Sequence, residues 1–283
     1  MKKKRITSAI ILYAILTAAA FITLLPLLYT VFSSFKTNAE IFAHPERLLP
    51  SKFTADNYRK VFTSETFNAP RMLLNSIYYT GIYVIFTLTT TTMAGYAFAR
   101  GEFPLKKIIF GIFSALMFIN LGTIVVYPMF KVLAALGLTT SLNSLLIVKL
   151  FTVNIVGMYM IRSYINTLPR ALDEAALIDG CGRFAIFRKI ILPLLKPVVV
   201  TLALIYFQGS WNEYLMPMIF TQSLKSQQTL IVGIVMLKNS GENAASMNLM
   251  LAGTTLALIP VILMYIVCNK YFVSGLTGGA VKG

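Results

Sequence analysis

Residues 168–197 read LPRALDEAALIDGCGRFAIFRKIILPLLKP, a short polar helix followed by a glycine turn and a cationic return to apolar sequence. Pro169 suits the first turn of a helix, and Asp173 and Glu174 fall in that turn, where the helix dipole favours acidic side chains. Gly180 and Gly182 predict the end of the helix, because glycine is the usual C-terminal cap. The stretch therefore predicts a small surface knob that can dock on another protein.

Long apolar runs lie on both sides of this stretch and decide the class of the protein. Hydrophobic residues make up 57% of the 283-residue chain and charged residues 12%, which is about half the charge of a soluble domain. A helix of about 20 apolar residues crosses the hydrocarbon core and satisfies its own backbone polar groups there. We therefore predict an all-α membrane protein with six transmembrane helices, near residues 10–32, 72–99, 108–130, 145–161, 198–220 and 243–269.

Positive residues gather in short segments between these runs. Clusters at residues 2–5, 100–107 and 162–196 favour the cytoplasmic side by the positive-inside rule, which places both termini and the surface knob in the cytoplasm. The loop 36–71 carries six cations and four acids, but long external loops count less toward orientation. The net charge of +15 is therefore not evidence for nucleic acid binding. The first apolar run resembles a signal peptide, but its length predicts a retained helix.

The sequence offers little support for catalytic or metal chemistry. Cys181, Cys268 and the single histidine, His44, form no metal-ligand spacing and no disulfide framework. We find no Walker-type phosphate loop, so the chain is not expected to be an ATPase, and no paired acids or nucleophile–base set of a membrane-embedded enzyme. No internal repeat or appended domain is evident. Residues 1–283 are read as one membrane domain with a core near 70–270.

The stretch 168–197 resembles the signature of the permease subunits of binding-protein-dependent ABC importers. That signature is Glu-Ala-Ala, three residues, glycine, nine residues, isoleucine, one residue and Leu-Pro, and it matches Glu174, Ala175, Ala176, Gly180, Ile190, Leu192 and Pro193. Parts of residues 34–58 resemble the first external loop of carbohydrate permeases. Residues 275–283 are similar to the end of the second permease subunit of maltose-type transporters. The resemblance covers essentially the whole chain.

The resemblance implies a permease that imports a sugar or oligosaccharide by alternating access in the bacterial cytoplasmic membrane. Its implied partners are a second permease subunit, two ATPase subunits that bind ATP and Mg²⁺, and an extracytoplasmic solute-binding protein. The same machine could carry a polyol or a glycerol-phosphate-like solute. An ion-driven secondary transporter is a further alternative, although the inverted repeats and midplane ionisable groups of such folds are not clear here.

The resemblance also implies contacts with the ATPase subunits. Within the coupling segment 168–197, the contacting residues would be Glu174, Ala175, Ala176, Asp179, Gly180, Ile190, Leu192 and Pro193. The tail, residues 274–283, would reach the ATPases as an extended chain, with Gly275, Gly278, Gly279, Lys282 and Gly283 as its contacts.

Polar residues inside the predicted spans are candidates for the solute path. Glu213 lies in the outer half of the fifth span, and Trp211, Asn212 and Tyr214 beside it could stack on a sugar ring or bind its hydroxyls. Glu213 could instead be a structural acid that pairs with the other permease. Lys149 lies about one turn into the fourth span; it is expected to extend to the membrane surface, and the alternative is that it lines the path.

Overall fold

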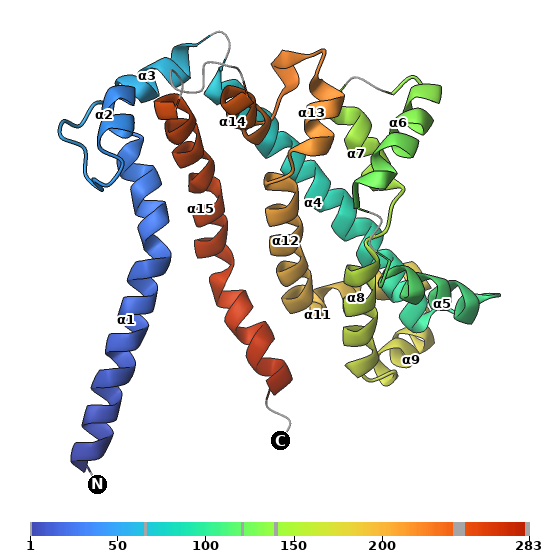
Figure 1. Cartoon of the computed structure of the whole chain (residues 1–283). Coiled ribbons are helices and arrows are strands. Elements are labelled where there is room, and N and C mark those ends of the chain that lie inside the picture. Colours follow the sequence, from blue (N-terminus) through green and yellow to red (C-terminus); the bar gives the residue numbers. More distant parts are fainter. Residues whose placement is uncertain (1, 65–66, 120–121, 139–140, 240–246, 281–283) are drawn as a thin grey trace. The chain divides into compact units, whose positions relative to one another are not determined.

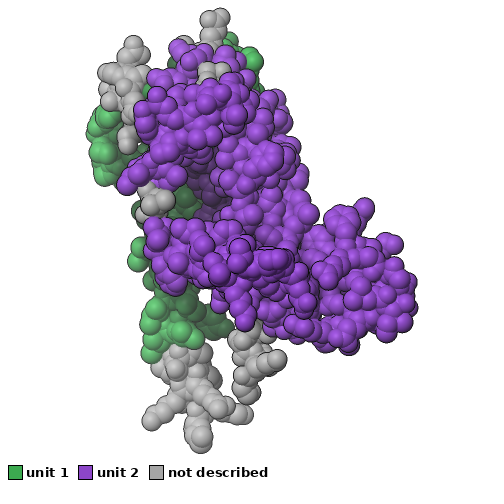
Figure 2. Space-filling model, turned by 90° about the vertical axis from the view of Figure 1, so that its right-hand side faces the viewer, with its two compact units in different colours: residues 1–71, 230–259 green, residues 72–229, 260–283 purple. Residues whose placement is uncertain are grey.

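The computed structural model describes residues 2–64, 67–119, 122–138, 141–239 and 247–280, and every regular element in these ranges is a helix (Figure 1). The chain divides into two compact units. The first contains residues 1–71 and 230–259, and the second contains residues 72–229 and 260–283 (Figure 2). The predicted all-helical fold is confirmed for the described part of the chain.

The first unit begins with α1 (Lys2–Ser33), whose apolar stretch Ile10–Ser33 is long enough to cross a membrane. Residues 10–27 of that stretch are all exposed, as expected for a helix that faces lipid. The remaining helices of this unit are α2 (Asn38–Ala43), α3 (Asp56–Thr63), α14 (Leu230–Asn239) and the first part of α15 (Met247–Ala280).

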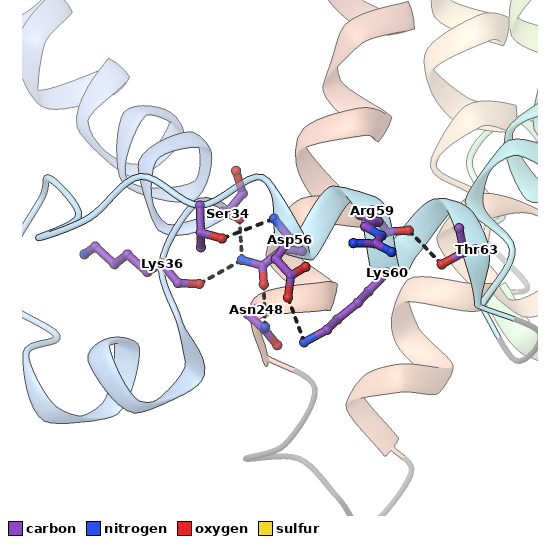
Figure 3. Close-up of polar contacts among 9 residues, drawn as sticks. Ser34, Lys36, Asp56, Arg59, Lys60, Thr63 and Asn248 are labelled. Atoms are coloured by element: carbon purple, nitrogen blue, oxygen red, sulfur yellow. Dashed lines mark hydrogen bonds and ion pairs between the residues drawn. The ribbon is translucent and has the colours of Figure 1, made fainter.

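A buried amide joins three segments of the first unit. The Asn57 side-chain nitrogen donates hydrogen bonds to the backbone oxygens of Ser34 and Lys36, at 2.7 and 2.8 Å, and its oxygen accepts one from Asn248 at 2.6 Å (Figure 3). Each group here is buried and hydrogen-bonded, so loss of the Asn57 amide would leave buried polar atoms unpaired. Asn57 therefore holds α3 against the end of α1 and the start of α15.

The loop that follows α1 is organised by a second polar group. The buried Lys36 ammonium donates to the Arg47 backbone oxygen, and the Ser51 backbone N–H donates to the Glu40 carboxylate at 2.5 Å. The Ser51 hydrogen bond, with smaller contributions from the cations of Lys36 and Arg47, lowers the pKa of Glu40 below its ordinary value. The loop thus has a defined conformation outside the apolar helices.

The second unit is built around the long helix α4 (Ala69–Arg100), whose first three residues belong to the first unit. Its further helices are α5 (Lys106–Leu116), η1 (Gly122–Val125), α6 (Val126–Ala135), α7 (Leu142–Leu150), α8 (Ile155–Thr167), α9 (Ala171–Ile178), α10 (Arg183–Ile186), the π-helical turn η2 (Phe187–Ile191), α11 (Leu192–Leu194), α12 (Lys196–Trp211), α13 (Leu215–Thr221) and η3 (Lys225–Gln227).

Four helical segments of the described chain are long and apolar enough to cross a membrane. They are Ile10–Ser33, Ala69–Arg100, Leu142–Asn166 and Met247–Cys268, and they coincide with the first, second, fourth and sixth predicted spans. A fifth candidate is the pair Arg183–Leu194 and Lys196–Trp211, which is bent by 79°. The structure therefore shows four or five apolar spans.

The third and fifth predicted spans differ from the structure. In the region 108–130, α5 ends at Leu116 and a second helical stretch starts at Gly122, whose φ of +52° is outside the helical range. The fifth predicted span is divided as well, because α12 ends at Trp211 and α13 starts at Leu215. The sequence is apolar throughout both regions, but the helix is interrupted in each of them.

Glycines allow the helices of the second unit to approach one another closely. A Cβ atom on Gly95 would lie 2.5 Å from the Ile161 side chain, so α4 and α8 meet at this point. A Cβ atom on Gly157 would overlap the hydroxyl of Tyr206, so α8 and α12 meet there. Lipid tails are as apolar as side chains, and such close packing is a main source of helix association in membranes.

Candidate functional site

Helix α9 and its glycine turn form the predicted surface knob. Asp173 and Glu174 lie in the first turn, as predicted, and Gly180 follows the helix with a φ of +79°. The Cys181 N–H bonds to the Ala176 oxygen at 2.9 Å, and the Gly180 N–H bonds to the Leu177 oxygen at 3.0 Å. These two bonds are the Schellman arrangement, which requires a left-handed residue and explains the glycine.

The two alanines of the signature face opposite ways. Ala176 is buried and packs in a core with Ile161 and Ile165 of α8 and Ile186 of the next helix, whereas Ala175 is exposed. The knob is therefore anchored by one face and free on the other. The free face carries Glu174, Asp179 and Gly180 together with the apolar side chains of Leu172, Leu177, Ile178 and Phe184, of which Ile178 is 87% exposed.

An ion pair fixes α9 to the end of α4. The Arg100 Nε lies 2.8 Å from an Asp173 carboxylate oxygen, and the side chains are only 10% and 13% exposed. A second guanidinium nitrogen of Arg100 donates to the Leu168 backbone oxygen at 2.8 Å. The Nε contact does not have hydrogen-bond geometry, and within the described residues neither Asp173 oxygen has a hydrogen-bond donor. Arg100 is thus the principal compensation for the Asp173 charge.

Sequence reasoning missed this pair. Arg100 was interpreted as a cation that sets orientation, and Asp173 as an acid that favours the helix dipole. They are 73 residues apart, and no spacing rule connects them. Beside the pair lies a pocket of about 350 Å³, lined partly by Tyr96, Arg170, Glu174 and Arg183.

The remaining signature residues lie where the chain turns from the knob toward α12. Ile190 lies in the π-helical turn η2, and Leu192 and Pro193 lie in α11. Ile190 and Leu192 are half-buried and Pro193 is exposed, so these residues shape the turn and are not part of the free face of the knob. The helical segments on either side of Leu195 make the 79° angle.

The intramembrane candidates cluster at the break between α12 and α13. The Tyr79 hydroxyl of α4 donates a hydrogen bond to Glu213 at 2.8 Å, so Glu213 has a partner within this chain. Trp211 is buried and stacks on Phe207, whereas Asn212 is exposed and Tyr214 is half-buried. Tyr79 was not among the residues predicted from the sequence. The geometry favours a structural role for Trp211 and leaves Asn212 accessible.

Two further predictions concern Lys149 and the tail. The Lys149 ammonium lies over the Tyr83 ring of α4, 4.8 Å from its centre. Helix α15 continues to Ala280, so Gly275, Gly278 and Gly279 lie in a helix and not in an extended chain. Lys282 and Gly283 are outside the described residues.

Comparison with known protein families identifies the family of the chain. Residues 91–277, which include the knob, the pocket and the turn into α12, match the family described as binding-protein-dependent transport system inner membrane component. The chain belongs to this family. The resemblance predicted from residues 174–193 is thereby confirmed.

Individual relatives of this inner membrane component span almost its whole length. It is 30% identical to the arabinooligosaccharides transport system permease protein AraQ of Halalkalibacterium halodurans, over 93% of each chain. It is 31% identical to the trehalose/maltose transport system permease protein MalG of Thermococcus litoralis, over 93% of each chain. It is also 32% identical to the trehalose transport system permease protein SugB of Mycobacterium tuberculosis, over 92% of this chain and 93% of that one.

A solved structure has the same fold. A chain of a bacterial ABC transporter involved in the import of the acidic polysaccharide alginate matches with a TM-score of 0.79 and 25% identity. The match covers 96% of the inner membrane component and 98% of the other chain.

Proposed function

We propose that this inner membrane component is a permease subunit of an ATP-driven importer for a sugar or oligosaccharide. The family supports the importer class, and the relatives named for arabinooligosaccharides, trehalose and maltose support the solute class. The partners are a second permease subunit, two ATPase subunits that bind ATP and Mg²⁺, and an extracytoplasmic binding protein. The permease itself supplies no ATPase activity.

The free face of the α9 knob is the observation that carries this proposal. It presents exposed apolar side chains, Ile178 foremost, beside the charges of Glu174 and Asp179. Exposed apolar side chains rimmed by charge are typical of protein interfaces. We assign this face to contact with one ATPase subunit.

The anchored face of the knob explains how movement reaches the membrane. Ala176 and the Arg100–Asp173 pair tie α9 to α8 and α4, and the turn through η2 and α11 ties it to α12. Movement of the knob is therefore transmitted to three membrane helices as a rigid body. Closure of the ATPases on ATP would drive the change between inward-open and outward-open states.

The topology completes the proposal. Six crossings place both termini and the knob in the cytoplasm, with the third crossing formed by α5, η1 and α6 and the fifth by α12 and α13. The positive residues between the apolar runs support this orientation. The tail from residue 274 is proposed as a second contact with the ATPases.

The experiment exploits two glycines that differ in backbone conformation. Gly180 has a φ of +79°, where a side chain costs about 1–2 kcal/mol, whereas Gly182 has a φ of −70° with open space around it. In the reconstituted importer, Gly180→Val is expected to reduce solute uptake per ATP hydrolysed, and Gly182→Val to leave this ratio unchanged. Equal ratios for both variants and wild type would refute the assigned role of the turn.

A second experiment tests directly whether the free face of the knob contacts an ATPase subunit. A photo-crosslinking residue at position 178 should join the permease to an ATPase subunit, and one at position 151 should not, although both side chains are more than 80% exposed. Crosslinking to the ATPase from position 151 but not from position 178 would exclude the proposed docking face.

A further inference from the structure

Lys149 places a positive charge beside the middle of the long apolar helix α4. Its ammonium lies 4.8 Å from the centre of the Tyr83 ring. Tyr83 is 14 residues after Ala69 and 17 before Arg100, the ends of α4, which corresponds to roughly 21 and 26 Å at 1.5 Å per residue. The ammonium therefore lies beside the middle of α4 and far from both of its ends.

No acid of the second unit compensates this charge. Among the described residues, four ion pairs occur and Lys149 takes part in none of them. The acids of this unit are Glu102, Asp173, Glu174, Asp179 and Glu213. Asp173 pairs with Arg100, Glu213 accepts from Tyr79, and the other three lie in α9, its cap or the segment after α4. Within the described residues of this unit, the Tyr83 ring is the compensating group recorded beside the Lys149 ammonium.

An aromatic ring is not sufficient for a cation at this depth. A cation–π contact contributes about 2 kcal/mol when desolvated, whereas the penalty for burying an ion is several kcal/mol. Lys131 offers a comparison, since its ammonium lies 5.5 Å from the Tyr127 ring of the same helix but the side chain is exposed. Lys149 is only partly exposed and therefore requires an additional anion or water.

The helical backbone is broken directly after Lys149. Helix α7 ends at Leu150 and α8 starts at Ile155, and Phe151 in the break between them is 81% exposed. Broken helices at membrane depth occur where the backbone is covered by protein or lines a cavity. The rings of Tyr83 and Tyr79 lie 5.9 Å apart, so two aromatic rings connect Lys149 to the second break, at Glu213.

We propose that Lys149 binds an anionic group of the transported solute, so that the solute is an acidic saccharide and not a neutral sugar or polyol. The ammonium would meet the carboxylate, and the Tyr83 ring would lie against the sugar. This inference rests on the proposed import function and specifies the solute class for it.

The first experiment asks what the importer carries. Cells that contain the complete importer with its binding protein, and matched cells without this permease, receive a mixture of neutral oligosaccharides and uronic acid oligosaccharides, and the internalised solutes are identified by mass spectrometry. Permease-dependent uptake of uronic acid oligosaccharides is the expected result. Uptake of neutral solutes alone overturns the inference but preserves the proposed function. If neither neutral nor uronic acid oligosaccharides are taken up, both the inference and the proposed function are overturned.

The second experiment tests the residue. Lys149→Met is expected to reduce uptake of the acidic oligosaccharide by about tenfold or more relative to its carboxyl-reduced neutral analogue, which corresponds to about 1.4 kcal/mol. Lys149→Arg should retain the preference, and Lys131→Met is the matched control that should change neither uptake. An equal loss for both solutes, or loss of the second permease from the purified complex with Lys149→Met, would show that Lys149 is structural and overturn the inference.

Discussion

The ion pair between Arg100 and Asp173 makes a quantitative prediction about the α9 knob. In Arg100→Ala, the Asp173 carboxylate remains 13% exposed in the native packing and loses the cation that pairs with it among the described residues. It has no hydrogen-bond donor within the described residues that could replace the guanidinium. The variant is therefore expected to loosen α9 from the rest of the second unit without unfolding the membrane helices.

The size of the effect follows from burial. Removal of one partner of a buried ion pair costs about 3–5 kcal/mol, because the other charge is left unpaired. Both side chains retain slight exposure, so the lower end of the range, about 3 kcal/mol, is appropriate. Since about 1.4 kcal/mol is tenfold, the equilibrium between the packed and loosened knob should shift by roughly a hundredfold.

Hydrogen exchange measures this shift directly. The Cys181 amide bonds to the Ala176 oxygen and is protected only while the end of α9 is folded. Its exchange proceeds through local opening, so the rate rises in proportion to the opening equilibrium constant. Mass spectrometry of the peptide around residues 171–182, in lipid nanodiscs, should show the hundredfold acceleration in Arg100→Ala.

Two controls make the result decisive. Arg100→Ala combined with Asp173→Ala removes the unpaired charge and should exchange more slowly than Arg100→Ala alone. Lys60→Ala breaks a pair with Asp56 whose side chains are both more than half exposed, and its effect on stability should not exceed about 0.5 kcal/mol. An acceleration of less than about threefold in Arg100→Ala, or a double variant that is as fast as the single one, would refute the reasoning.

Three further predictions concern other parts of the chain. Gly157→Ala places a methyl group against the Tyr206 hydroxyl and should destabilise the protein by about 1–3 kcal/mol in thermal unfolding, whereas Gly209→Ala, with open space around it, should have little effect and serves as the control. Asn57→Ala leaves buried hydrogen-bonding groups unpaired and should cost about 2–4 kcal/mol in the same assay; an unchanged unfolding temperature would contradict this. The pKa of Glu40 is lower in the folded protein than its ordinary value of 4.5. The carboxylate therefore stabilises the loop fully at pH values above 4.5, and this stabilisation is lost as the pH falls through the lower, folded-state pKa. The difference in loop hydrogen exchange between wild type and Glu40→Gln should therefore be constant at neutral pH and vanish as the pH falls through the lowered pKa of Glu40; a difference that persists once the carboxylate is protonated would exclude this role.

The sequence predicted those features that depend on local chemistry. The acids at 173 and 174 and the glycine at 180 are sufficient to place a short helix and its Schellman turn, because both effects act within a few residues. Apolar length was similarly sufficient for four of the spans. The family signature lies in this local part of the sequence, and it gave the correct family.

Features that depend on three-dimensional packing were not predictable. Ala175 and Ala176 are the same residue type at adjacent positions, but only Ala176 is buried in the core. Which of the two faces inward depends on how α9 is oriented about its axis by the helices that pack against it. The contact of the Lys149 ammonium with the Tyr83 ring was also not predictable, because it depends on where α4 packs. The division of the third run is set by backbone conformation near Gly122, to which a hydropathy average is insensitive.

The sharp bend at Leu195, between the helical segment Arg183–Leu194 and α12, determines in which direction α12 can be displaced. The two segments meet at 79°, so a push along the surface segment acts almost perpendicular to the axis of α12. Such a push swings α12 sideways and hardly slides it through the bilayer. Sideways swing keeps apolar side chains at their original depth in lipid, whereas sliding would expose them to headgroups. The bend therefore favours a sideways movement of α12, in which its apolar side chains stay in the hydrocarbon core.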